Sequence, residues 1–313
     1  MSRKIILVTG GAGFIGSNLC HELVDKGNDV IALDDLSLSS ERNISDLLGS
    51  RHFRFVKGSI LDANLLSKEM KGVDAILHEA AIPSVQRSIN DPRLTNMVNI
   101  SGTLEVLIAA KNAGIKKVIL ASSSSVYGDT PTLPKREDMV ANPKSIYAAS
   151  KFTCEQYCMI FNRIYGMCNV GLRYFNVYGP TQDPNSEYAA VVPRFITMAL
   201  SGRPLAVYGT GAQTRDFTYV KDVVQANSRA LDPRVSGIFN VGSGTAISIK
   251  DLASLIGDIV GMEPALMYSE ARAGDVNDSL ADISKANREF GYQPQYNIKD
   301  GLKELVEWFG KQR

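Results

Sequence analysis

Short apolar runs alternate with helical patterns through the first half of the chain. Six runs rich in β-branched residues predict strands, namely "IILVT", "DVIALD", "FRFV", "AILHEA", "KVILAS" and "CNVGLRY". After the first of them, Ile15, Leu19 and Leu23 lie at helical spacing, and the pattern ends at Gly27, a residue type common just beyond a helix. This alternation predicts an α/β fold, a doubly wound parallel sheet with helices on both faces.

The pattern changes after about Asn176, where proline, glycine and tyrosine become frequent in "YGPTQDPNSEYAAVVP". We therefore expect a first domain over residues 1–175 and a smaller mixed α/β domain over 176–313. Within the second, "RDFTYVKDVVQANSRAL" followed by "GIFNVGSG" predicts a helix and then a strand. We expect residues 215–241 to return and pack on the first sheet.

Charge and hydropathy exclude several classes of partner. The 313 residues include 34 basic and 33 acidic side chains, a formal net charge of +1, so no basic surface is expected to attract nucleic acid or an anionic membrane. The longest apolar stretches fall short of the ~18 residues that span a bilayer. The opening "KIILVTGG" is typical of a buried first strand rather than a signal peptide.

Cysteine and histidine are sparse. The chain contains Cys20, Cys154, Cys158, Cys168, His21, His52 and His78. These residues are too few and too scattered for a structural zinc site, and we interpret Cys154 and Cys158, one helical turn apart, as packing residues. We expect no metal and a reducing cytoplasmic environment.

A glycine-rich turn follows the first predicted strand. In "VTGGAGFIGSNL", Gly10, Gly13 and Gly16 precede a helix, and Asp34 ends the next strand. Glycine lets the backbone approach a pyrophosphate at the helix N-terminus, and an acidic residue about 20 positions later can bind the adenosine ribose. Asp34 would repel a 2′-phosphate, so NAD is favoured over NADP. Asp35 beside it is either a second ribose contact or a turn residue.

Tyr147 and Lys151 in "SIYAASK" lie at i, i+4, downstream of four serines in "ASSSSVYGD". The pair is either an ordinary surface pair on a helix or a catalytic unit. Tyrosine acts as a base near neutral pH only where positive charge stabilises its anion. Lys151 and an oxidised nicotinamide would supply that charge, and a serine hydroxyl would share the proton of a substrate alcohol.

These motifs resemble the extended short-chain dehydrogenase/reductase family over essentially the whole chain. The resemblance gives the catalytic hydroxyl to Ser123, four residues before Tyr127, and places Asn99 of "NISGT" beside the cofactor. It also implies cofactor contacts by Phe14, Ile15, Ser59, Ile60, Ala80 and Ala81. Ser59 departs from the acidic residue that the family often has there, which implies weaker adenine recognition.

Family members oxidise a nucleotide-linked sugar at C4 and then diverge. Dehydratases and some decarboxylases carry acidic side chains just after the catalytic Ser or Thr, where this chain has Ser124 and Ser125. Without an acid or base for elimination, the keto sugar is expected to turn over and recover its hydride on the other face. The resemblance therefore implies a 4-epimerase that retains NAD.

The second half is similar to UDP-hexose 4-epimerases, especially those that act on UDP-N-acetylglucosamine. By position, the residues around the UDP would be Asn176, Tyr208, Arg215, Arg272 and Asp275, and Val192 is a further expected substrate contact. Two guanidiniums can bind a diphosphate in an otherwise neutral protein, although an isolated arginine is commonly part of a surface ion pair. Tyr208 would lie near uracil and Asp275 on the uridine ribose.

The resemblance also implies which sugar fits. The positions that match the wall of the N-acetyl-accepting epimerases are Ser124, Asn176, Gln182, Ala190 and Ser279. Epimerases restricted to glucose have a bulky tyrosine where this chain has Ser279. Pro83 stands where the N-acetyl-accepting group has glycine, so other substituents could enter.

We therefore expect an NAD-retaining 4-epimerase of UDP-N-acetylhexosamines. The alternatives are a UDP-glucose/UDP-galactose 4-epimerase and, from another class, a catalytically silent NAD-sensing protein. The intact Ser123, Tyr147 and Lys151 argue against the silent protein. The resemblance also implies a homodimer through the helix after Thr95 and the helix that bears Tyr147.

Overall fold

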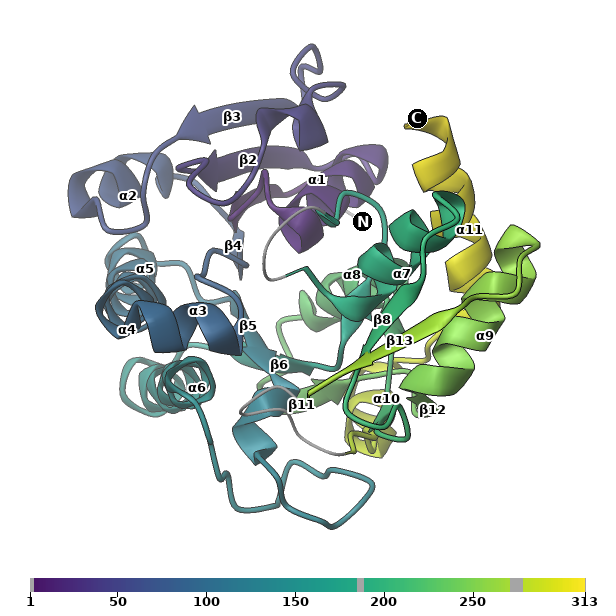
Figure 1. Ribbon diagram of the computed structural model, residues 1–313. Helices are drawn as coiled ribbons and strands as arrows, with labels where there is room; N and C mark the ends of the chain where they lie inside the picture. The colour runs from purple at the N-terminus through teal and green to yellow at the C-terminus, as the bar shows by residue number, and fades with distance from the viewer. Residues whose placement is uncertain (1–2, 185–188, 271–277, 313) are drawn as a thin grey trace.

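A parallel sheet forms the centre of the protein. The computed structural model describes residues 3–184, 189–270 and 278–312. Within these residues, seven strands pair in the order β11-β6-β5-β4-β1-β2-β3, and all neighbours are parallel (Figure 1). The strands are β1 (Ile5–Thr9), β2 (Asp29–Asp34), β3 (Phe53–Lys57), β4 (Ala75–His78), β5 (Val118–Ser123), β6 (Val170–Tyr174) and β11 (Gly237–Val241). The first six coincide with the six predicted runs.

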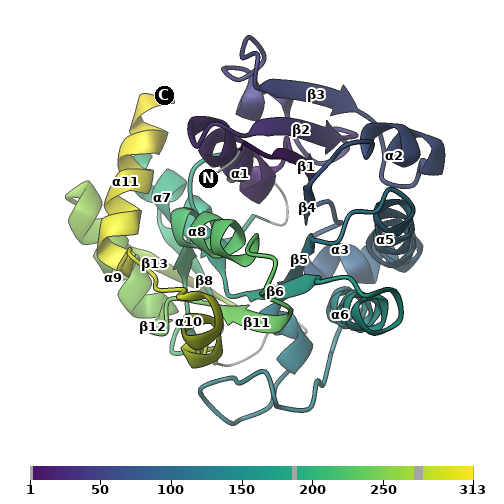
Figure 2. The same ribbon diagram turned by 180° about the vertical axis from the view of Figure 1, so that it is seen from behind.

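Helices cover both faces of this sheet, as expected for strands that are apolar on both sides. One face packs on α1 (Phe14–Asp25), η1 (Glu41–Ile44) and α8 (Val220–Ala230), with α10 (Ser284–Phe290) near its edge. The other packs on α2 (Ala63–Glu69), α5 (Thr103–Asn112) and α6 (Ile146–Tyr165). Helices α1 and α8 lie side by side in Figure 2. The predicted doubly wound α/β fold is confirmed.

The segment from α8 to β11 joins the first sheet although it comes late in the sequence. Strand β11 pairs with β6 in a parallel register that places Gly237 opposite Val170. Helix α8 carries buried valine and alanine side chains to the same core as α1. This return brings the chain that follows β6 back beside the strands of the first half.

The remaining elements build a second core beside the sheet (Figure 1). They are β7 (Val177–Tyr178), α7 (Val191–Leu200), β8 (Leu205–Tyr208), β9 (Thr214–Arg215), β10 (Thr218–Tyr219), β12 (Ile247–Ser248), α9 (Ile249–Val260), β13 (Leu266–Ser269) and α11 (Ile298–Lys311). Strand β8 pairs with β13, β7 with β10, and β9 with β12. No helix in the described part of the chain is long and apolar enough to span a membrane.

Short helical segments lie on the α6 side of the sheet. They are α3 (Val85–Asn90), α4 (Pro92–Thr95), η2 (Asn96–Gly102) and η3 (Ser124–Tyr127). The helix expected after Thr95 is α5 preceded by η2, which is a π-helix. A π-helix widens the backbone turn, and such turns are frequent at functional sites.

Candidate active site

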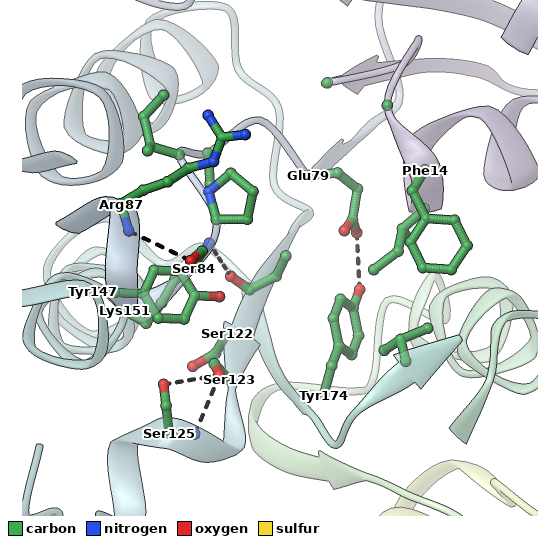
Figure 3. Close-up of a pocket in the computed structure, with 18 of the residues that line it drawn as sticks. Phe14, Glu79, Ser84, Arg87, Ser122, Ser123, Ser125, Tyr147, Lys151 and Tyr174 are labelled. Atoms are coloured by element: carbon green, nitrogen blue, oxygen red, sulfur yellow. Dashed lines mark hydrogen bonds between the residues drawn. The ribbon is translucent and has the colours of Figure 1, made fainter. Parts of the chain in front are cut away.

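A cleft of about 1000 Å³ opens at the carboxyl ends of β1, β4, β5 and β6. Its walls come from the glycine turn after β1, the segment after β4, the serine turn after β5, α6 and the loops of the second core (Figure 3). The strand order reverses between β1 and β4, and ligands of doubly wound sheets bind at such a switch point. The topology therefore places a ligand site here.

The glycine turn lies against the segment after β4. A Cβ on Gly16 would lie 2.0 Å from the carbonyl oxygen of Gly10, and a Cβ on Gly10 would lie 2.7 Å from the backbone nitrogen of Ala80. Gly10 also has φ +70°, which glycine adopts without strain. Helix α1 starts right after Gly13 with no side-chain cap, so its N-terminus is open to an anion. This cradle fits the pyrophosphate of a dinucleotide.

Asp34 closes the adenosine end of the cleft. Its Oδ2 accepts the backbone N–H of Ala12 at 3.0 Å, and its Oδ1 accepts the N–H of Leu36 at 2.9 Å and the hydroxyl of Ser39 at 2.7 Å. A carboxylate oxygen has about two lone pairs. The three hydrogen bonds from the protein therefore occupy part of the acceptor sites of Asp34 that we expected the ribose hydroxyls to use. Asp35 also lines the cleft, and its Oδ1 accepts the N–H of Ser37 at 2.9 Å, as a turn residue does.

The structure places most of the other expected cofactor contacts in this cleft. The lining includes Phe14, Ile15, Ile60, Ala80 and Ala81. Ser59 does not line it, and the Ser59 hydroxyl accepts the N–H of Leu61 at 3.2 Å.

Asn99 lies behind the cleft wall and holds it in place. Its Oδ1 accepts the N–H of Ile82 at 2.8 Å, while its Nδ2 donates to the Ile82 carbonyl at 3.2 Å and to the Ser150 hydroxyl at 3.0 Å. The side chain is 1% exposed. Asn99 thus ties the segment after β4 to α6 rather than facing the cavity.

Ser123, Tyr147 and Lys151 meet in the cleft (Figure 3). Helix α6 begins where the Ser145 hydroxyl accepts the N–H of Ala148 at 3.1 Å, which sets Tyr147 in the first helical turn. Lys151 is 5% exposed; its Nζ donates to the carbonyl of Ala121 at 2.8 Å and lies 6.0 Å from the centre of the Tyr147 ring. The ammonium is therefore buried beside the cleft and is not part of an exposed surface pair.

The serine turn after β5 holds its own hydrogen bonds. The Ser123 hydroxyl oxygen accepts from the hydroxyl of Ser125 at 2.9 Å and from its N–H at 3.2 Å. Ser124 and Ser125 also line the cleft. The turn therefore presents hydroxyl groups and no carboxylate to a bound molecule.

A buried ion pair supports the serine turn from behind. Arg173 donates to Glu155 at 2.8 and 2.7 Å, and the Ser122 hydroxyl donates to the same carboxylate at 2.5 Å. The guanidinium lies 4.7 Å from the centre of the Tyr127 ring, whose hydroxyl donates to Asn240 at 2.7 Å. Sequence reasoning missed this pair; the signal was a charge inside the apolar run "CNVGLRY".

Ser279 and Asn176 contact each other in the opposite wall. The Asn176 Nδ2 donates to the Ser279 hydroxyl at 3.0 Å and to the carbonyl of Asp216 at 3.0 Å, and the Asp216 N–H points at the same hydroxyl at 3.4 Å. Ser279 is 5% exposed. The other expected wall residues, Gln182 and Ala190, also line the cleft.

A side hollow of about 220 Å³ adjoins the cleft. Val192 and Tyr208 line it, and Arg215 and Asn176 line both spaces. Arg194 lies 5.3 Å from the centre of the Tyr208 ring. Two of the expected UDP contacts, Arg272 and Asp275, lie outside the described residues.

Pro83 lines the cleft next to a residue with an unusual backbone conformation. Ser84 has φ +90°, a conformation that costs a non-glycine residue about 1–3 kcal/mol. Its hydroxyl accepts the N–H of Arg87 at 3.4 Å, which starts α3 (Figure 3). Pro83, which stands where the N-acetyl-accepting epimerases have glycine, thus lies beside a strained turn in the cleft wall.

Two ionisable groups at the end of β4 were not predicted. His78 lies between the hydroxyls of Thr9 at 2.7 Å and Thr103 at 2.9 Å, and burial, helped by the charge of Lys151, lowers its pKa to about 3. Glu79 faces the cleft, and burial raises its pKa to about 7. Both residues form the polar end of the run "AILHEA", which was the only signal for them in the sequence.

Known proteins share this fold and these motifs. Residues 6–242 match the family described as NAD dependent epimerase/dehydratase. A UDP-glucose 4-epimerase of Mycolicibacterium smegmatis is 41% identical over 97% of both chains. The chain therefore belongs to the NAD dependent epimerase/dehydratase family. The expected family, the cofactor NAD and the class of enzyme, an NAD-dependent 4-epimerase, are confirmed.

Solved structures agree with this assignment. The UDP-N-acetylglucosamine 4-epimerase of Methanobrevibacter ruminantium, determined with UDP-N-acetylmuramic acid, is 40% identical over 100% of both chains with a TM-score of 0.96. The UDP-glucose 4-epimerase of Thermotoga maritima, determined with UDP-glucose, is 36% identical over 98% of this chain and 99% of that one, with a TM-score of 0.94. These two enzymes are named for different substrates, UDP-N-acetylglucosamine and UDP-glucose.

Proposed function

We propose that the protein is a 4-epimerase of UDP-N-acetylhexosamines, which interconverts UDP-N-acetylglucosamine and UDP-N-acetylgalactosamine. The coarser part, 4-epimerisation of a UDP-linked sugar, is supported by relatives that cover nearly the whole chain. The choice of sugar rests on Ser279, a small side chain held by Asn176 in the wall of the cleft that Tyr147 enters from the other side. A serine there leaves room beside the sugar ring that a large side chain would occupy.

Tyr147 and Lys151 would carry out the proton transfer at the C4 hydroxyl. NAD, when bound, would supply the hydride acceptor for C4 and the hydride donor for the return step. Lys151 is fixed by the carbonyl of Ala121, so its charge is available to stabilise the phenolate form of Tyr147, which acts as the base and takes the C4 hydroxyl proton. The Ser123 hydroxyl lies in the same cleft and would hydrogen-bond the C4 oxygen.

The serine turn favours epimerisation over elimination. Ser124 and Ser125 line the cleft beside Ser123, and neither hydroxyl can serve as a strong acid or base for removal of water from the sugar. A 4-keto sugar formed here would have to turn and regain hydride on its other face. The wall residues Gln182 and Ala190 would border the space in which it turns.

Arg215 and Tyr208 would bind the UDP part. Arg215 is 9% exposed and lines both the cleft and the side hollow. A guanidinium can donate two parallel hydrogen bonds to a phosphate. Tyr208 lines the side hollow next to it and would pack near the uracil, and Arg272 and Asp275 remain proposed contacts by sequence position.

One experiment decides between the proposed sugar and its rival. Purified protein is incubated with UDP-N-acetylglucosamine or UDP-glucose without added cofactor, and the anomeric proton signals of each epimer are followed by NMR. We expect both N-acetyl epimers to form, with kcat/KM at least ~10-fold above that for UDP-glucose, a difference of about 1.4 kcal/mol. The reverse preference would make the protein a UDP-glucose/UDP-galactose 4-epimerase, and no conversion with NAD supplied would favour the silent NAD-binding protein.

We also propose that the protein is a homodimer. The neighbouring helices η2 and α6 expose apolar side chains, with Met97 46% exposed, Ile160 46% and Ile164 64%. Such a strip is costly in water, and a second copy would cover it with its own equivalent strip.

We propose a cytoplasmic location because the four cysteines are free thiols.

A further inference from the structure

Glu79 lines the cleft between the two turns that a bound dinucleotide would span. It directly follows β4, between the glycine turn after β1 and the serine turn after β5. A Cβ on Gly10 would lie 2.9 Å from the carbonyl carbon of Glu79, so the two backbones are in contact. A cofactor that extends from the glycine turn to Tyr147 and Lys151 therefore passes the Glu79 side chain, which lines the same cleft.

Among the residues that the structure describes, only one oxygen of the Glu79 carboxyl group has a hydrogen-bond partner. The Tyr174 hydroxyl donates to Oε1 at 2.8 Å (Figure 3), and that hydroxyl in turn accepts from Asn227 at 2.8 Å. The second oxygen, Oε2, has no hydrogen-bond partner among the residues that the structure describes. One face of the carboxyl group is thus left to whatever occupies the cleft.

The charges around Glu79 come from few groups. Helix α6 brings the ammonium of Lys151, β6 brings the neutral Tyr174, and α8 brings the neutral Asn227. His78, next on the chain, is uncharged above about pH 3, the pKa to which burial lowers it. The glycine turn adds no ionisable side chain. Burial raises the pKa of Glu79 to about 7, while the Tyr174 hydrogen bond and Lys151 act in the opposite direction.

We propose that Glu79 takes up a proton when NAD binds and then donates a hydrogen bond from Oε2 toward the dinucleotide. A carboxylate beside the pyrophosphate would face like charge and lose its remaining water, and both effects favour the neutral acid. The protonated group has an O–H donor that the carboxylate lacks. Glu79 thus makes cofactor retention depend on pH.

The sign of this dependence follows from proton linkage. If the complex holds a proton on Glu79 that the free enzyme has lost, affinity for NAD falls as pH rises above about 7, the pKa of Glu79. The loss is about tenfold per pH unit until the acid in the complex also ionises. Below pH 7 both states hold the proton, and affinity is independent of this group.

The test measures cofactor retained by the holoenzyme rather than activity. Protein purified with its NAD is ultrafiltered repeatedly at pH 6.0, 7.5 and 9.0, and NAD per protomer is measured after acid release. For wild type we expect at least ~10-fold weaker retention at pH 9.0 than at pH 6.0. Glu79→Gln, which mimics the neutral acid, should retain NAD equally at all three values, and the matched control Glu263→Gln, an exposed glutamate outside the cleft, should follow wild type.

Tyr174→Phe tests the hydrogen bond separately. Removal of the phenol takes away an interaction that lowers the pKa of Glu79, so the loss of NAD should begin at higher pH than in wild type. Wild-type retention that does not change between pH 6.0 and 9.0 would overturn the proposal, whatever the variants do. A Glu79→Gln protein that folds but follows the wild-type profile, or that loses NAD at every pH, would also overturn it.

Discussion

Replacement of Ser279 by tyrosine would test how the cleft wall selects its sugar. The Ser279 hydroxyl accepts from Asn176 at 3.0 Å and faces the Asp216 N–H at 3.4 Å. At 5% exposure, the site has no space for an aromatic ring within the wall. A tyrosine ring must therefore project into the cleft, where we expect the C2 substituent of the sugar.

The expected effect has a shared part and a selective part. Loss of the serine acceptor removes from the wall one hydrogen bond worth about 1 kcal/mol of stability, whichever sugar is bound, and Asn176 keeps its second bond to the carbonyl of Asp216. Overlap of the ring with an acetamido group costs about 1–3 kcal/mol more, whereas a hydroxyl at C2 is small enough to escape it. The ratio of kcat/KM for UDP-N-acetylglucosamine over UDP-glucose should therefore fall by roughly 10- to 100-fold.

The assay compares initial epimerisation rates on both sugars for wild type, Ser279→Tyr and the control Ser279→Ala. The alanine variant removes the hydroxyl without adding bulk, so it measures the shared part alone. It should change kcat/KM by the same factor for both sugars. Bound NAD and the unfolding temperature show whether each variant is folded. Equal losses on both sugars in Ser279→Tyr would place Ser279 outside the C2 pocket, and the proposed preference for N-acetylhexosamines would have to be abandoned.

Three further changes test other parts of the site. Tyr147→Phe should lower turnover by at least ~10² with little change in UDP-sugar binding, and unchanged turnover would exclude Tyr147 as the base. Gly16→Ala should lower retained NAD by at least ~10-fold, because its Cβ would lie 2.0 Å from a backbone oxygen, whereas Gly49→Ala, with nothing within 4 Å, should not. Ile160→Glu should convert dimer to monomer in light scattering, while Val140→Glu, on a loop and 86% exposed, should leave the mass unchanged; a dimer that survives the first change would contradict the proposed interface.

The sequence by itself was sufficient for the parallel sheet and for the family. Strands of such a sheet are buried on both faces, so they appear as short apolar runs between helical patterns, and all six predicted runs became strands. The glycine turn could also be predicted from the sequence, because a Cβ on Gly10 or Gly16 would lie 2.7 or 2.0 Å from a backbone atom of an adjacent segment. These features depend on neighbours in sequence or on one pair of adjacent strands.

The tertiary structure decided what lies around these motifs. The contact between Asn176 and Ser279 joins residues that are distant in the chain, and no periodicity in either segment predicts it. The same is true of the Arg173–Glu155 pair behind the serine turn. Both depend on the way in which the loops of the second core and α6 close over the sheet.

The pKa values of the ionisable side chains at the end of β4 depended most on the fold. A glutamate after "AILH" could have been an exposed strand terminus, and its ordinary acidity would then have been expected. Glu79 instead lies at the switch point between β1 and β4, against Tyr174. Its pKa of about 7 comes from desolvation in that cleft, and desolvation is a property of the packed structure that the order of residues does not reveal.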